Sequence, residues 1–161
     1  MTCKKVEGMQ PRMENPAFVS PDARTGIGSI CNTVNPGGIP PELREIVALR
    51  ASQINGCSAC VYAHVQNLRK AGESDERVAA VATWRQTPFF TDAERAALEL
   101  AEKATRLSGR SADAVPDELW EQLSAHFDLQ QLSVLILLTR VTSMFNCLNA
   151  VVRQPVGMSW S

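Results

Sequence analysis

Residues 45–64 read EIVALRASQINGCSACVYAH, and they join two helical segments at Asn55-Gly56. Proline is tolerated in the first turn of a helix, so Pro40-Pro41 predicts a helix that begins there and runs to about Ser52. Asn-Gly is a strong turn signal and ends it. A second helix is predicted from about residue 57 to 70, with Gly72 as its C-terminal signal.

Two cysteines and a histidine lie at the start of this second helix. At 3.6 residues per turn, Cys57 and His64 differ in direction by about 20°, and Cys60 lies within about 60° of both. One helical face is therefore expected to carry two sulfurs and an imidazole. This is the minimum apparatus for dithiol–disulfide chemistry with its own proton carrier.

The sequence leaves open which of the two cysteines is the more reactive. A cysteine reacts as its thiolate, and the free N–H groups at a helix N-terminus favour that form at Cys57. His64 lies one turn beyond Cys60 and favours Cys60 instead, because it can accept a proton from it. In either case the second cysteine can resolve a sulfenic acid or a mixed disulfide formed on the first.

Three other interpretations of the cysteine pair are possible. A structural zinc site usually draws a second pair of ligands from elsewhere, but His126 is isolated in the sequence. A thioredoxin-like motif requires strands around the helix, and no segment of this chain alternates with a period of two. Third, the two cysteines can simply be buried structural residues. The helical spacing of His64 favours the redox interpretation over all three.

The remaining chain predicts an all-α fold of about six helices. Further helices are expected from Ser74-Asp75 to about Gln86, from a capping box at Thr91–Glu94 to near Gly109, and over about 117–126. The last helix is capped by Asp128 with Gln131 and runs to about Arg153. It is apolar around much of its circumference, which is typical of a central core helix or a subunit interface. Residues 1–39, rich in proline and glycine, are predicted to form a loop-rich arm with at most one short helical turn near Asp22–Ile30, and residues 40–161 the helical domain.

Composition limits the partners and the compartment. The 161 residues are 45% hydrophobic and 20% charged, with a net charge of −1. These values are ordinary for one globular domain and favour neither nucleic acid nor a membrane as a partner. No apolar core of a signal peptide follows Met1, so the cytoplasm is the expected compartment. Of the five cysteines, Cys3, Cys31 and Cys147 are expected to be buried structural thiols.

The pattern Glu-x11-Cys-x2-Cys-x3-His resembles the alkylhydroperoxidase D (AhpD) core of the carboxymuconolactone decarboxylase superfamily. It is formed here by Glu45, Cys57, Cys60 and His64. The resemblance covers roughly residues 40–152. It includes Leu49–Cys57, Trp84-Arg85, Phe90–Leu98 and the Asn146-x-x-Asn149 pair. The sequence departs from the family at Ala59, where relatives carry tyrosine, and at Ala150, where an arginine is frequent.

The resemblance implies an oligomeric all-α protein, a trimer or a hexamer, that reduces hydroperoxides with thiols and without metal or flavin. It implies that Cys60 attacks the peroxide and that Cys57 is the resolving partner. His64 would carry the proton, and Glu45 would orient it. The implied reductant is an external dithiol, such as a lipoyl-bearing protein.

Two alternatives to a peroxidase remain. One is a decarboxylase- or lactonase-like enzyme of the same superfamily, although such relatives lack the cysteine pair. The other is a redox-sensing or scaffold oligomer without efficient turnover.

Overall fold

The computed structural model describes residues 10–35, 38–107 and 114–158, and these residues form helices and no strand. The helices are α1 (Pro16–Val19), α2 (Pro21–Val34), α3 (Pro41–Asn55), α4 (Ser58–Lys70), α5 (Asp75–Ala80), the 3-10 helix η1 (Val81–Gln86), α6 (Asp92–Thr105), α7 (Asp117–His126) and α8 (Leu129–Val152). The all-α prediction is confirmed. The described residues contain eight α-helices where about six were expected, because the N-terminal region adds two.

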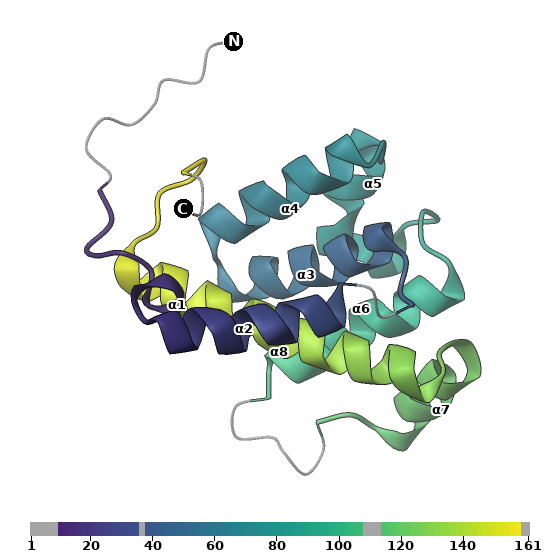
Figure 1. Ribbon diagram of the computed structural model, residues 1–161. Coiled ribbons are helices and arrows are strands. Elements are labelled where there is room, and N and C mark those ends of the chain that lie inside the picture. Colours follow the sequence, from purple (N-terminus) through teal and green to yellow (C-terminus); the bar gives the residue numbers. More distant parts are fainter. Residues whose placement is uncertain (1–9, 36–37, 108–113, 159–161) are drawn as a thin grey trace.

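Helix α3 lies at the centre of the fold and contacts α4, α6 and α8 (Figure 1). It is buried on nearly all sides and separates two hydrophobic clusters. Val47 faces the cluster that includes Leu100, Leu123 and Leu135. Ile46 and Leu49 face the second cluster, which includes Leu68, Val81 and Trp84. Burial of side chains of this size is worth about 2 kcal/mol each, so these three residues help to fix α3, and the site residues that it carries, in the core.

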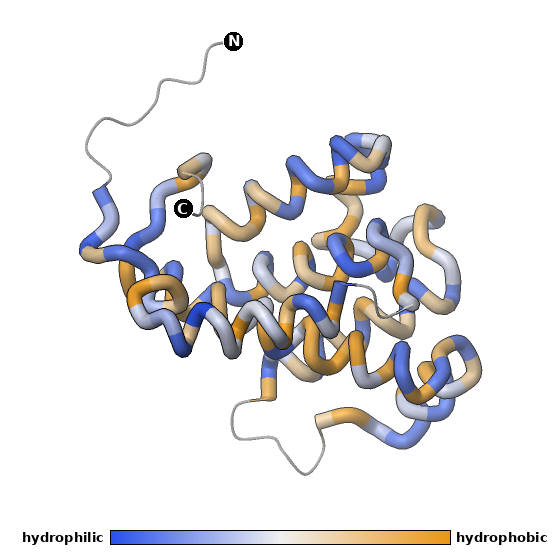
Figure 2. The backbone as a smooth tube through the Cα atoms, viewed as in Figure 1, coloured by the Kyte–Doolittle hydropathy of each residue, from blue (hydrophilic) through white to orange (hydrophobic). Residues whose placement is uncertain are grey.

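Helix α8 contacts α2, α3, α4, α6 and α7, and its residues Leu132, Val134 and Leu135 belong to the first hydrophobic cluster. It is a core helix on these faces only, because it is not buried all round. Its C-terminal half buries a polar face made of Thr139, Thr142, Asn146 and Asn149. Apolar side chains on its other faces are exposed, namely Leu129, Ile136, Leu137 and Val151. Hydrophobic residues recur along this helix, whereas the turn between α4 and α5 is hydrophilic (Figure 2). The prediction of a subunit interface on α8 stays a prediction.

By length and composition, α8 is also the one described helix that could cross a membrane, with a mean hydropathy of 1.5. One third of that stretch (33%) is buried inside the protein. A core helix of a soluble protein passes the same test, so a single such helix is weak evidence for a membrane span.

The predicted helix boundaries between residues 40 and 152 agree closely with the structure where local capping signals were present. The capping boxes of α6 and α8 both form, at Thr91 with Glu94 and at Asp128 with Gln131. The helix expected over 75–86 instead changes to a 3-10 helix after Ala80, with a non-helical backbone at Thr83. Helix α6 ends at Thr105, and Gly109 lies outside the described residues.

The prediction of a loop-rich arm is wrong for residues 16–34. Pro16 and Pro21 are the first residues of α1 and α2, where the missing N–H costs no hydrogen bond. The side chains of Asn15 and Ser20 cap the two helices. Helix α2 lies along α8 (Figure 1), and this packing stabilises it despite two glycines in its interior.

A buried carboxylate ties three helical segments together on the α6 side of α3. The Oε1 atom of Glu102 lies 2.6 Å from Arg50 Nη2 of α3 and accepts a hydrogen bond from Trp84 Nε1 at 3.0 Å. Its Oε2 atom lies 2.7 Å from Arg85 Nη1 of η1. Burial alone would raise the pKa of Glu102, but these hydrogen bonds from Arg85, Trp84 and Arg50 lower it to about 2. The carboxylate is therefore more stable in the folded chain than in the unfolded one.

Glu102→Gln should remove a pH dependence of stability. A carboxylate with an ordinary pKa of 4.5, lowered to about 2 by folding, stabilises the protein above pH 4.5. That contribution is lost as the pH falls from about 4.5 to about 2. We expect the variant to lose about 3 kcal/mol at neutral pH, because Arg50 becomes a buried unpaired charge, and to show a flatter acid profile. Urea unfolding at a series of pH values measures both, and an unchanged acid slope would contradict the assignment.

Candidate functional site

The two cysteines lie at the junction between α3 and α4. Helix α3 ends at Asn55, and Gly56 takes a left-handed backbone with φ of 68°. Cys57 is extended and is the N-cap of α4, where its Sγ accepts a hydrogen bond from the backbone N–H of Cys60 at 3.4 Å. The predicted position at a helix N-terminus is confirmed. Cys57 is the N-cap residue and lies just outside the helix, so its direction relative to His64 stays a prediction.

Cys57 and Cys60 form a disulfide, with their Cα atoms 5.3 Å apart. Both residues are buried, at 5% and 4% exposure. Their Cα separation lies within the ordinary range for a disulfide, so the start of α4 holds the two sulfurs close enough to bond.

Glu45 of α3 and His64 of α4 are joined by a hydrogen bond across the helix hairpin. The Oε2 atom of Glu45 lies 2.8 Å from His64 Nδ1 and 3.3 Å from the side-chain amide nitrogen of Asn67. A carboxylate can only accept hydrogen bonds, so the proton between the two groups lies on Nδ1. The second ring nitrogen, Nε2, is therefore the atom that can take up or release a proton.

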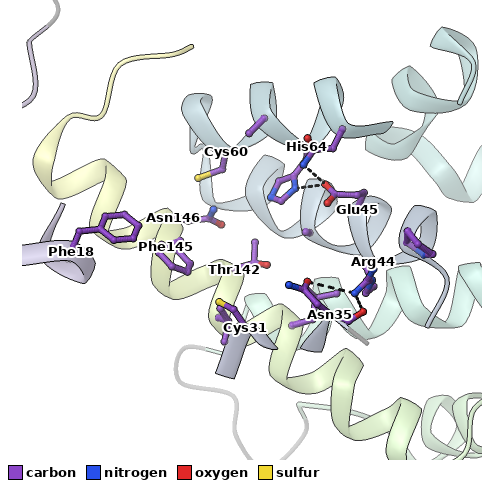
Figure 3. A pocket seen from close by; sticks show the side chains of 16 residues that line it. Phe18, Cys31, Asn35, Arg44, Glu45, Cys60, His64, Thr142, Phe145 and Asn146 are labelled. Carbon is purple, nitrogen blue, oxygen red and sulfur yellow. Dashed lines mark hydrogen bonds and ion pairs between the residues drawn. The ribbon is translucent and has the colours of Figure 1, made fainter. Parts of the chain in front are cut away.

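A pocket of about 390 Å³ lies between α2, α3, α4 and α8 (Figure 3). Cys60, His64 and Glu45 line it, so the structure brings three of the four sequence-predicted residues to one cavity and leaves Cys57 bonded to Cys60. Much of the remaining wall is apolar and includes Phe18, Leu138, Val141 and Phe145. Arg44 also lines the pocket, but its guanidinium donates to the carbonyl oxygens of Val34 and Asn35 at the end of α2.

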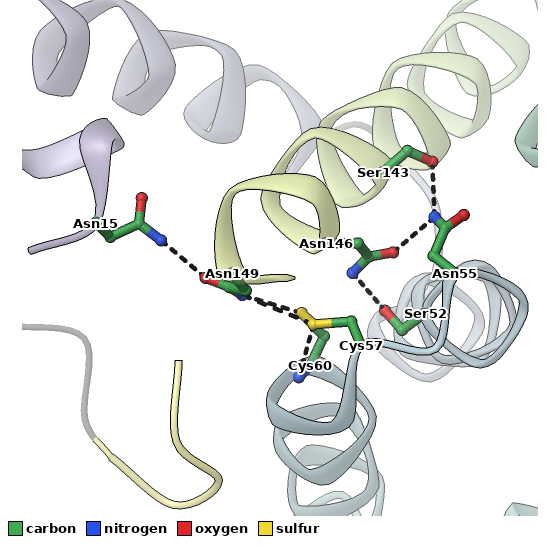
Figure 4. The surroundings of a disulfide bond; sticks show 8 residues. All are labelled: Asn15, Ser52, Asn55, Cys57, Cys60, Ser143, Asn146 and Asn149. Atoms are coloured by element: carbon green, nitrogen blue, oxygen red, sulfur yellow. Dashed lines mark hydrogen bonds between the residues drawn. A yellow bond between two sulfur atoms is a disulfide. The ribbon is translucent and has the colours of Figure 1, made fainter. Parts of the chain in front are cut away.

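Side-chain amides from α8 and the N-terminal segment surround the disulfide (Figure 4). Asn149 Nδ2 lies 3.1 Å from Cys60 Sγ, and Asn15 Nδ2 donates to Asn149 Oδ1 at 2.8 Å. Asn146, one turn earlier, binds Ser52 and Asn55 of α3. Sequence reasoning noted the two α8 asparagines as part of a resemblance and gave them no role. It missed Asn15, whose only local signal was its place before Pro16.

The other cysteines differ from their expected description. Cys147 is exposed and Cys31 is half-buried, so neither is the buried structural thiol that was expected, and Cys3 lies outside the described residues. Cys31 lines the pocket from α2, and burial raises the pKa of its thiol. Within the three described ranges, no three His, Cys, Asp or Glu residues cluster in a way that could hold a metal ion.

Residues 21–103 match the model of the carboxymuconolactone decarboxylase family. The chain belongs to this family. An uncharacterized Bacillus subtilis protein, YdfG, is 35% identical over 103 residues, which cover 64% of this chain and 68% of that protein. Family membership agrees with the resemblance seen at Glu45, Cys57, Cys60 and His64.

Two other relatives connect the family to AhpD. The alkyl hydroperoxide reductase AhpD of Methylobacterium sp. is 39% identical over 66 residues, which cover 41% of this chain and only 35% of that protein. A solved structure from Agrobacterium tumefaciens, of a protein of unknown function suggested to be the antioxidant defence protein AhpD, superposes with a TM-score of 0.82 at 29% identity. That match covers 93% of this chain and all of the other.

Glu45→Gln should slow the reaction of the reduced cysteine pair with iodoacetamide at neutral pH. Glutamine has the shape of glutamate but lacks the negative charge that holds the His64 proton. Loss of this hydrogen bond to a charged group is expected to lower the alkylation rate about tenfold. The half-exposed position of Glu45 predicts an unchanged fold. Glu42→Gln, in the first turn of the same helix, is the matched control. Equal alkylation rates across the pH range would show that Glu45 is only a solvated charge.

Proposed function

We propose that this protein is a thiol-dependent peroxidase that reduces organic hydroperoxides through Cys60 and Cys57. The observation that carries the proposal is the pocket, where a redox-capable sulfur, the hydrogen-bonded Glu45 and His64 side chains and an apolar wall meet. Membership of a family that includes AhpD supports the same activity. The reductant is proposed to be an external dithiol.

The first half of the proposed reaction takes place at Cys60, the cysteine that lines the pocket. The Cys60 thiolate attacks one peroxide oxygen, so that an S–O bond forms and the O–O bond breaks. His64 Nε2 first accepts the proton of the Cys60 thiol and then returns it to the leaving alkoxide, which departs as an alcohol. Cys60 is oxidised to a sulfenic acid, and the hydroperoxide is reduced by two electrons.

The second half uses Cys57, which lies within disulfide-forming distance. Its sulfur attacks the sulfenic acid, the S–S bond forms, and the hydroxyl group leaves as water after protonation. An external dithiol then exchanges with this disulfide, restores both thiols and is itself oxidised to a disulfide. The overall products are the alcohol, water and the oxidised dithiol. They account for all atoms and electrons of the hydroperoxide and the reduced dithiol.

A homo-oligomer is part of the proposal. Leu129, Ile136, Leu137 and Val151 of α8 expose apolar surface that a second copy of the chain would cover. The resemblance to AhpD proteins suggests a trimer or a hexamer.

The decisive test is hydroperoxide consumption by the reduced protein with a dithiol donor. Cys60→Ser should abolish turnover, because it removes the sulfur proposed to attack the peroxide, and burial raises the pKa of Cys31, the other thiol on the pocket wall. Cys57→Ser should allow at most one turnover, because the sulfenic acid has no resolving partner. Cys147→Ser is the matched control, because this cysteine is exposed on α8 and takes no part in the proposed reaction.

Normal turnover by Cys60→Ser would overturn the proposal. No turnover by the wild type, combined with reversible disulfide formation and a change in oligomer size, would favour a redox switch instead. Conversion of a carboxylated lactone in the absence of a dithiol would favour the decarboxylase-like alternative.

Val141→Phe should distinguish a bulky substrate from hydrogen peroxide. Val141 lines the apolar wall, so a larger ring fills space that an organic group would occupy. We expect the KM for cumene hydroperoxide to rise about tenfold, with little change for hydrogen peroxide. Val156→Phe, at an exposed position after the end of α8, is the control. Equal effects on both peroxides would contradict binding of the organic group in this pocket.

A further inference from the structure

A buried amide lies against the sulfurs on the side opposite to helix α4. Asn149 Nδ2 is 3.1 Å from Cys60 Sγ and 3.8 Å from Cys57 Sγ (Figure 4). Asn149 is only 3% exposed, so water does not compete freely for these contacts. Cys57 Sγ therefore meets the backbone N–H of Cys60 in α4, and both sulfurs meet the side-chain amide of Asn149 in α8.

The orientation of this amide is fixed by a chain of hydrogen bonds that begins in the backbone. The N–H of Ala17 donates to Asn15 Oδ1 at 3.0 Å, and a backbone N–H can only donate. The Asn15 oxygen must face Ala17, which turns its Nδ2 toward Asn149 Oδ1 at 2.8 Å. The NH₂ group of Asn149 must then point at the sulfurs. The two amides cannot flip without breaking this chain.

We propose that Asn149 is a catalytic residue that stabilises negative charge on the Cys60 sulfur, and that Asn15 is the positioning residue that orients it. The inference rests on the proposed thiol chemistry. A thiolate forms on Cys60 before it attacks the peroxide, and a thiolate leaves when an external dithiol opens the disulfide. A preorganised donor stabilises the charge at both stages without adding a charge of its own.

The neighbouring Asn146 makes no such contact with the sulfurs, so the contact is specific to Asn149. Both asparagines lie on the buried face of α8, one turn apart, and both are nearly inaccessible. Asn146 uses its NH₂ group to bind Ser52 Oγ at 3.0 Å, and its oxygen accepts from Asn55 at 2.9 Å. Its amide joins α8 to α3, whereas that of Asn149 is directed at the sulfurs.

The test is the pH dependence of Cys60 alkylation. The reduced protein is used in a Cys57→Ser background, in which the tryptic peptide 51–69 carries Cys60 as its one cysteine. We expect Asn149→Leu to move the alkylation midpoint to higher pH and to lower the rate at neutral pH about tenfold. Asn149→Asp should move it further, since a carboxylate cannot donate and repels the thiolate. Asn15→Leu should shift it in the same direction by less.

The matched control is Asn146→Leu, which removes an equally buried amide from the same helix. Its midpoint should stay at the wild-type value even if its melting temperature falls, because this amide bonds to Ser52 and Asn55 of α3 and not to the sulfurs. Alkylation midpoints that rise in the order wild type, Asn149→Leu, Asn149→Asp support the inference. Unchanged midpoints in the folded Asn149 variants would overturn it. If one Asn149 variant does not fold, the other and Asn15→Leu still give the direction of the shift.

Failure of this inference can be told apart from failure of the proposed function. Alkylation needs no peroxide and no reductant, so the midpoints can be compared even if the wild type does not turn over. Peroxide turnover that needs both cysteines but is indifferent to Asn149 would retain the function and reject the role of the amide.

Discussion

The site depends on one backbone constraint, the left-handed conformation of Gly56. A residue with a Cβ atom is disfavoured at its φ of 68°, whereas glycine takes this conformation without penalty. The reversal ends α3 and folds α4 back along it, so that Glu45 meets His64 at 2.8 Å. It also leaves Cys57 extended at the start of α4, in reach of Cys60. A straight continuation of the helix would separate all of these groups.

The second requirement is the polar face of α8, which explains the unusual composition of that helix. Buried polar groups are stable only when they are hydrogen-bonded, and Thr139, Asn146 and Asn149 on this face each have a specific partner. Asn146 binds α3, Asn149 binds the sulfurs, and the Thr139 hydroxyl binds the Leu135 carbonyl within α8. The polar face of α8, an unusual surface to bury in a protein core, therefore contributes Asn149 to the site.

Local signals account for what sequence analysis predicted and for what it missed. Helices from α3 to α8 carry caps, terminal glycines or initial prolines close to their observed ends. The same signals stand at Asn15-Pro16 and Ser20-Pro21, but the absence of a sustained apolar period there favoured a loop. Helix α2 is stabilised by contact with α8, a contribution that periodicity does not report. The break at Thr83 has no evident sequence signal.

The sequence by itself determined the all-α fold, the family and the arrangement within α4. Cys60 and His64 are one turn apart on a single helix, and helical geometry alone relates them. The tertiary structure decided which sulfur lines the pocket, how the Glu45 carboxylate meets His64, and which amide faces the disulfide. The contacts of Asn149 with Cys60 and with Asn15 span 89 and 134 residues. Contacts at such separations depend on how helices pack, and no local spacing encodes them.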